Sequence, residues 1–233
     1  MKILAIEASC ISCSVAVLDG DKITSEIFVN NKLTHSQTLM PMIENALNSA
    51  GLKIDDFDYI ALSHGPGSFT GLKIAGATAM GLAFGAGKKI IGVSTLESLC
   101  YNLPCTPHLI SPIMDARKNQ VYNALYRWED EKLKEITPPR ALSVEELKDE
   151  INEDVIFVGD GVAVYEAYFS ENLKEKARFA PPNLRYAKAS SVAVAAKNKV
   201  LEKPDFDYSI ENFKLEYIRL SQAEQNLKKG LIL

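Results

Sequence analysis

The spacing of apolar residues switches repeatedly between strand and helix patterns along the first hundred residues. A continuous apolar run from Lys2 to Ala8 predicts a buried strand, and an apolar stripe at helical spacing predicts a helix from His35 to Ala50. The same patterns predict further strands at residues 14–18, 22–29, 59–63 and 89–93, and further helices at 68–85 and 95–101. The predicted order is three strands, a helix, a strand, a helix, a strand and a helix.

The second part of the chain repeats this order after a boundary marked by Pro104 and Pro107. Strands are predicted at residues 109–114, 120–126, 132–136, 154–158 and 178–180, and helices at 143–150, 162–169 and 187–200. Sequence identity between the halves is negligible, so the repeat is one of pattern only. We therefore predict an α/β fold with an N-terminal subdomain at 1–103 and a C-terminal subdomain at 104–233, whose tail from residue 205 packs over the first subdomain or onto a partner.

Two tandem βββαβαβα units suggest the actin, Hsp70 and sugar-kinase (ribonuclease H-like) architecture, in which nucleotide binds between the halves. At the positions that approach phosphate in such a fold, the chain offers a candidate vestigial nucleotide site. The candidate residues are Glu7, Ser9, Gly65, Gly67, Ser68 and Asp115. Glu7 and Asp115 could form an acid pair across a cleft, or could serve only for capping and ion pairing, for example with Arg117. Gly159-Asp160-Gly161 is a weak signal for an adenosine-side loop.

The turn Gly65-Pro66-Gly67 leads into a helix of unusually small residues, with Ser68 or Thr70 as its cap. Its small residues Gly71, Ala75, Thr78, Ala79 and Gly85 lie on one arc. Because glycine destabilises a helix interior by about 1 kcal/mol relative to alanine, close approach of another backbone is the expected compensation. A phosphate cradle at the helix start and a plain structural turn are the alternatives.

Composition narrows the functional classes. The 233 residues carry a net charge of −4, which argues against a protein that grips nucleic acid alone. The N-terminus lacks the features of a signal peptide, and no apolar run approaches the length of a membrane span, so we expect a cytoplasmic protein. The histidines and cysteines lack the spacing of a metal site, and we expect free cysteines and no bound metal.

Six sequence blocks, in order along the chain, resemble the TsaB (YeaZ) family. They are ILAIEAS (3–9), HSQTLMPMI (35–43), GPGSFTGLKIA (65–75), GVSTLESL (92–99), DARKNQVYNALY (115–126) and YIR (217–219). The chain departs from the family pattern at Glu7 and Ala8, where aspartate and threonine are common, and at Lys73, where arginine is usual.

The resemblance implies a non-catalytic paralogue of the TsaD transferase, which forms N6-threonylcarbamoyladenosine at position 37 of tRNAs that read ANN codons. The expected partners are TsaD, TsaE and, in isolation, a second copy, with tRNA only indirectly involved and weak ATP or ADP binding at a subunit interface. The helices 36–50 and 68–85 are the expected interface. Its candidate residues are Ser36, Leu39, Met42, Ile43, Leu47, Gly71, Leu72, Ala75 and Ala79.

This interface hypothesis predicts that Gly71→Leu or Ala75→Glu disrupts dimerisation in a chain that still folds. The alternative hypothesis is an enzyme, either an actin-fold phosphotransferase or a glycoprotease-like metallohydrolase. The block Val93–Ser98 replaces the histidine-rich metal motif expected of the catalytic paralogue, which argues against catalysis.

Overall fold

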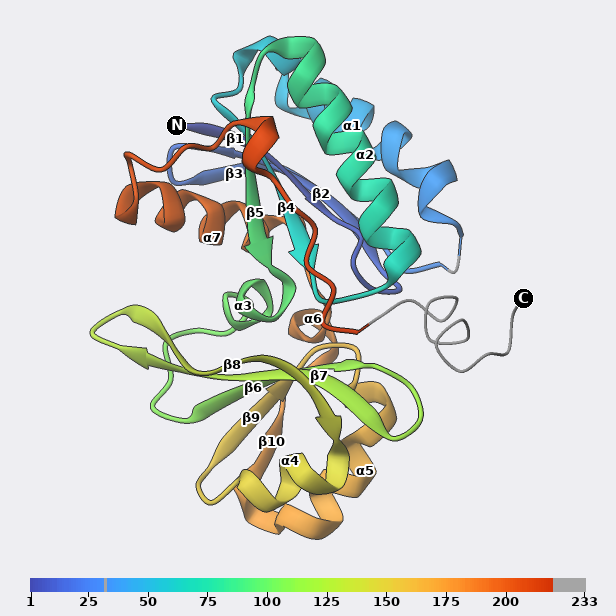
Figure 1. Cartoon of the computed structure of the whole chain (residues 1–233), viewed down its shortest axis with the longest axis vertical. Helices are drawn as coiled ribbons and strands as arrows, with labels where there is room; N and C mark the ends of the chain where they lie inside the picture. The colour runs from blue at the N-terminus through green and yellow to red at the C-terminus, as the bar shows by residue number, and fades with distance from the viewer. Residues whose placement is uncertain (32, 220–233) are drawn as a thin grey trace.

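The first domain is built on a five-stranded mixed sheet with the strand order β3-β2-β1-β4-β5. The computed structural model describes residues 1–31 and 33–219, and shows two such sheets in separate halves of the molecule (Figure 1). β1 pairs antiparallel with β2 and parallel with β4. The elements of this part are β1 (Lys2–Glu7), β2 (Cys13–Asp19), β3 (Lys22–Val29), α1 (His35–Ala50), η1 (Ile54–Asp56), β4 (Tyr59–Gly65), α2 (Phe69–Ala86), β5 (Lys89–Ser94) and α3 (Thr95–Cys100).

The second sheet has the order β10-β9-β6-β7-β8, which repeats the first when each strand is matched to its counterpart. The predicted tandem repeat of βββαβαβα is therefore confirmed. The elements are β6 (Leu109–Asp115), β7 (Gln120–Glu129), β8 (Lys132–Ser143), α4 (Val144–Glu150), β9 (Val155–Val158), α5 (Val162–Leu173), η2 (Lys174–Lys176), β10 (Ala177–Phe179), α6 (Pro182–Arg185), α7 (Ala189–Glu202) and η3 (Ile210–Asn212). β8 continues beyond the predicted end at Ile136 because its pairing with β7 extends to Ser143, and an edge strand tolerates Pro138 and Pro139.

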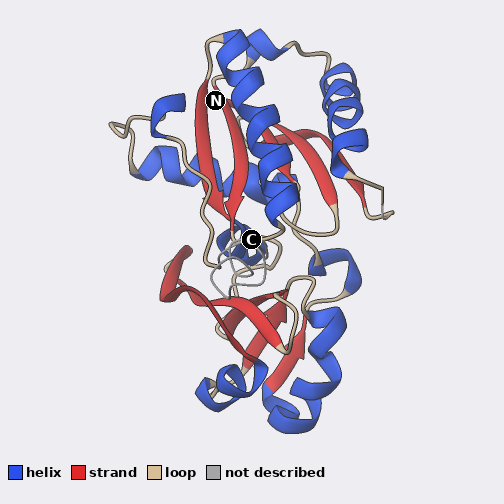
Figure 2. Cartoon of the chain, turned by 45° about the vertical axis from the view of Figure 1, so that its right-hand side comes forward, coloured by secondary structure: helices blue, strands red, loops and turns tan. Residues whose placement is uncertain are grey.

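Helices cover both faces of the first sheet. Alternation along β1 sends Leu4 and Ile6 to the face covered by α1 and α2, and Ile3 and Ala5 to the face covered by α7. Figure 2 shows the same layers in a turned view. The sheet is thus buried on both faces, which explains the continuous apolar run in β1.

The packing of α7 corrects the predicted domain boundary. A division at 103/104 puts this helix in the C-terminal subdomain, but its buried side chains, including Val192 and Ala196, pack against the first sheet. The reason is that the first sheet would otherwise leave one apolar face without a covering layer. The chain therefore crosses back to the first domain after α6.

Residues 203–219, which we call the C-terminal strap, continue over the first domain. The backbone N–H of Ile90 donates to the carbonyl of Tyr208 at 2.9 Å, and the N–H of Glu216 donates to the carbonyl of His64 at 2.8 Å. The strap then reaches the second domain, where Arg219 Nη1 donates to the carbonyl of Ala116 at 2.8 Å. The prediction that the tail packs over the first domain is confirmed for these residues; residues 220–233 lie outside the described part.

α2 alone among the described helices is long and apolar enough to cross a membrane, judged by length and composition. Core helices of soluble proteins also meet that criterion. One face of α2, which includes Leu72 and Ala79, is buried within the domain.

Candidate functional site

The carboxylate of Glu7 lies fully buried at the end of β1, and its hydrogen-bond donors come from the same chain. Oε1 accepts hydrogen bonds from the backbone N–H of Ser9 at 2.6 Å and from its hydroxyl, and Oε2 accepts one from the hydroxyl of Ser63. Burial raises the pKa of Glu7, and these hydrogen bonds from Ser63 and Ser9 oppose the rise. The strand end therefore holds a carboxylate that two serines already satisfy.

The glycine turn before α2 is enclosed by two segments of its own chain. The N–H of Ser68 donates to the carbonyl of Ser9 at 2.7 Å, and a Cβ at Gly67 would overlap that carbonyl. Gly65 has a φ of +131°, and a Cβ there would overlap the carbonyl of Glu216 in the strap. These contacts favour the close-packing interpretation of the turn over the phosphate cradle.

Gly71 also packs against its own chain. A Cβ at this position would overlap the carbonyl of Ala8 and lie 3.2 Å from Cδ2 of His35, whose Nε2 is 2.8 Å from the carbonyl of Cys10. Ser68 caps α2 as predicted, with its hydroxyl accepting from the N–H of Gly71. The expectation that a partner approaches at Gly71 is therefore wrong, and Gly71→Leu would disturb the fold itself.

Asp115 and Asp160 meet at the corresponding end of the second sheet. The N–H of Asp115 donates to Oδ1 of Asp160 at 3.3 Å, and Oδ1 of Asp115 accepts from the N–H of Arg117 at 2.8 Å and the hydroxyl of Tyr165 at 3.2 Å. Burial raises the pKa of Asp160 to about 6. Glu7 and Asp115 have separate hydrogen-bond partners within the described residues, so an acid pair across a cleft stays a prediction. The neighbour of Asp115 is Asp160, for which the sequence offered only the weak signal of the Gly159-Asp160-Gly161 loop.

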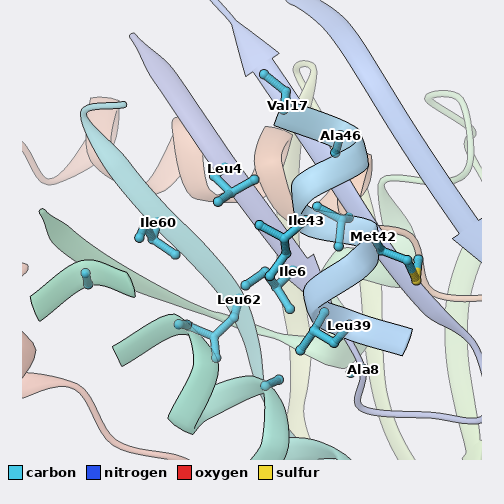
Figure 3. Close-up of a cluster of buried hydrophobic side chains, with 14 of the residues drawn as sticks. Leu4, Ile6, Ala8, Val17, Leu39, Met42, Ile43, Ala46, Ile60 and Leu62 are labelled. Atoms are coloured by element: carbon cyan, nitrogen blue, oxygen red, sulfur yellow. The ribbon is translucent and has the colours of Figure 1, made fainter. Parts of the chain in front are cut away.

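Most of the predicted interface residues lie in the core of the first domain. Figure 3 shows Leu39, Met42 and Ile43 pointing from α1 towards the strands. The buried members of the predicted set are Leu39, Met42, Ile43, Gly71, Leu72, Ala75 and Ala79. Leu47 is half-buried against the same core and Ser36 is exposed. Those seven predictions are wrong because an apolar stripe at helical spacing faces the sheet that the helix covers.

The opposite sides of these helices expose further apolar and small residues. We refer to the exposed apolar and small residues of these two neighbouring helices as the α1–α2 face, defined by Met40 on α1 and by Ala77, Met80, Gly81 and Phe84 on α2. The side chain of Phe84 is 82% exposed, Met40 41% and Met80 38%. A Cβ at Gly81 would meet no atom within 4 Å. A helix that is apolar on most sides is expected to be covered on most sides, but residues 1–31 and 33–219 cover α2 on one side only.

The cysteines and histidines form no cluster with the geometry of a metal site. Within the described residues, no three side chains of His, Cys, Asp or Glu are grouped so as to hold an ion. Cys10, Cys13 and Cys100 are buried free thiols and Cys105 is an exposed one.

Comparison with known proteins identifies the family. The family model described as TsaD, tRNA N6-adenosine threonylcarbamoyltransferase, matches residues 22–227. The chain is 30% identical over 227 residues to the tRNA threonylcarbamoyladenosine biosynthesis protein TsaB of Bacillus subtilis, covering 96% of each, and 31% identical to TsaB of Haemophilus influenzae, covering 74% of this chain and 78% of that protein.

The fold comparison agrees. The structure of YeaZ from Pseudomonas aeruginosa matches with a TM-score of 0.77 at 23% identity, covering 93% of this chain and 99% of that one. This likeness supports the actin-like, ribonuclease H-like architecture that the tandem repeat predicts. Together with the full-length similarity to the Bacillus protein, it shows that the chain belongs to the TsaB (YeaZ) family.

Proposed function

We propose that this chain is a non-catalytic subunit of the cytoplasmic machinery that forms threonylcarbamoyladenosine in tRNA. The similarity of nearly the whole chain to the threonylcarbamoyladenosine biosynthesis protein TsaB of Bacillus subtilis supports a role in that biosynthesis. In this proposal the chain pairs with TsaD, the catalytic paralogue, works alongside TsaE, and contacts tRNA only through them.

The observation that carries the proposal is the α1–α2 face. Phe84 is largely exposed and Met80 partly exposed on the same helix as Ala77 and Gly81, whose small side chains leave room for a second helix to approach closely. Interfaces concentrate their binding energy in exposed aromatic and aliphatic anchors of this kind. The occupant we assign is TsaD, and a second copy of this chain occupies the face when TsaD is absent.

The non-catalytic part of the proposal is supported by the groups that fill the strand-end site. Ser9 and Ser63 donate hydrogen bonds to the carboxylate of Glu7. The carbonyls of Ser9 and of Glu216 in the strap pack against the glycine turn. A phosphate would have to displace these contacts. Weak binding of ATP or ADP at a subunit interface stays a prediction.

The test is complementation of a bacterial strain depleted of its own TsaB, with threonylcarbamoyladenosine in total tRNA measured by mass spectrometry. The parent chain and Glu7→Gln should both restore the nucleoside, because in this proposal Glu7 has a structural role and takes no part in catalysis. Phe84→Glu should fail, because it places a charge at the centre of the docking face. Val164→Glu, a matched change at an exposed position on α5, should restore it.

The enzyme hypothesis predicts the opposite result for Glu7→Gln and Phe84→Glu. If a folded Glu7→Gln variant fails to restore the nucleoside while Phe84→Glu succeeds, the chain acts through the strand-end carboxylate and the proposed role is wrong. Circular dichroism of each purified variant separates loss of function from loss of fold.

A further inference from the structure

A pocket of about 430 Å³ lies at the junction of the two domains, away from both Glu7 and the α1–α2 face. α3 lies at this junction, between α7 and the β7–β8 strands (Figure 1). Lining residues come from α3, from α7 and from the hairpin that joins β7 to β8. Pockets of about 300–1,000 Å³ are of the size that holds small molecules.

Glu97 on α3 contributes a carboxylate without a donor. Its side chain is partly buried, and no hydrogen bond or ion pair to that carboxylate is formed within residues 1–31 and 33–219. Burial raises its pKa, which Lys199 partly opposes. Glu97 is only partly buried and water still reaches its carboxylate oxygens, so a ligand ammonium would replace that water with a charge-assisted hydrogen bond.

Lys199 on α7 supplies the opposite charge in the same pocket. Its Nζ donates to the carbonyl of Gly92 at 2.7 Å, and an ammonium has three donors, so two remain. The hydroxyl of Tyr101 accepts a hydrogen bond from Asn198 at 3.3 Å and keeps its own proton to donate. Leu133 of β8 adds apolar surface from the second domain.

We propose that this pocket binds a small zwitterion of the amino acid class, with its ammonium on Glu97 and its carboxylate on Lys199. Glu131, Glu202, Lys132 and Lys203 also line the pocket, so acidic and basic groups face it in equal number, and a ligand with a single charge would meet repulsion from the groups of its own sign. A zwitterion satisfies both kinds of group. Since Leu133 belongs to one domain and Lys199 packs with the other, the bound ligand would also bridge the domains.

The test measures binding of each standard L-amino acid to the full chain by saturation-transfer NMR and calorimetry. At least one should bind, and its N-acetyl derivative, which lacks the ammonium, should not. Glu97→Gln should weaken that binding about tenfold or more, because a charge-assisted hydrogen bond is lost. Leu133→Trp should also abolish it by filling the pocket.

Glu171→Gln on α5 is the control, because it removes an exposed carboxylate outside the pocket and should leave binding unchanged. Without ligand, Glu97→Gln should be at least as resistant to denaturant as the parent at neutral pH, so weaker binding would not reflect unfolding. The proposal is overturned if no amino acid binds, if the N-acetyl derivative binds equally well, or if Glu97→Gln and Leu133→Trp both bind like the parent.

Discussion

Two backbone carbonyls explain the glycines at the start of α2. The carbonyls of Ser9 and Ala8 occupy the space that a Cβ would need at Gly67 and Gly71, so close approach occurs within the chain. Gly81, farther along the same helix, has open space around it. Residues of one type in one helix therefore serve different purposes, and substitutions should separate them.

Gly71→Ala should lower the free energy of unfolding by about 1–3 kcal/mol or more, because the new methyl group overlaps the carbonyl of Ala8. Gly81→Ala is the matched control in the same helix and should raise it by about 0.5–1 kcal/mol. Urea denaturation followed by circular dichroism measures both. Equal effects of the two substitutions would contradict this account of the glycines.

Asp160 should make stability depend on pH. Its folded pKa of about 6 lies above the ordinary value of 3.8, so the folded state binds a proton more tightly than the unfolded state, and stability falls as pH rises between these values. Asp160→Asn should therefore gain stability relative to the parent by about 1–3 kcal/mol between pH 4 and pH 8. Denaturation of both proteins at several pH values measures this gain, and a difference that is constant with pH would exclude it.

At the scale of elements, packing partners decide what each helix does. The stripe on α1 was predictable from its spacing, but helical spacing alone cannot say whether the stripe faces a partner or the sheet of its own domain. The composition of α2 could have indicated an apolar exposed side, because Lys73 is the single charged residue among its eighteen. A helix that is covered on one side only normally carries more charged residues on the other. Likewise, the pattern predicted α7 but not which sheet it covers, because that depends on contacts between residues far apart in sequence.

The strap behaves as part of the first domain, and its buried anchor is Tyr208. The ring of Tyr208 packs edge-on against Tyr59 at 5.9 Å, and its hydroxyl donates to the carbonyl of Lys199 at 3.0 Å. Tyr208→Ala should lower the free energy of unfolding by about 3–5 kcal/mol, as for other buried aromatic residues. Phe206→Ala, at a neighbouring exposed ring, should cost less than about 1 kcal/mol. Similar losses for both, in denaturant melts, would show that the strap is not anchored at Tyr208.

At the scale of the whole molecule, the order of elements and the repeated sheet topology followed from apolar patterning. The position of the carboxylate of Glu7 at a strand end was also predictable. Its hydrogen bond from Ser63 was not, because Ser63 belongs to a strand 56 residues away in the sequence. Tertiary contacts thus place groups of the same chain against Glu7 and the glycine turn, whereas the α1–α2 face exposes, among the described residues, the apolar side chains that the proposed function uses.

The most direct test of that function is the affinity of purified TsaD for this chain, measured by calorimetry for the parent, Phe84→Glu and Val164→Glu. Loss of an interface anchor typically costs about 2 kcal/mol or more, so Phe84→Glu should weaken binding at least about thirtyfold, while Val164→Glu binds like the parent. The account is contradicted if the parent does not bind TsaD, or if Phe84→Glu binds as tightly as the parent.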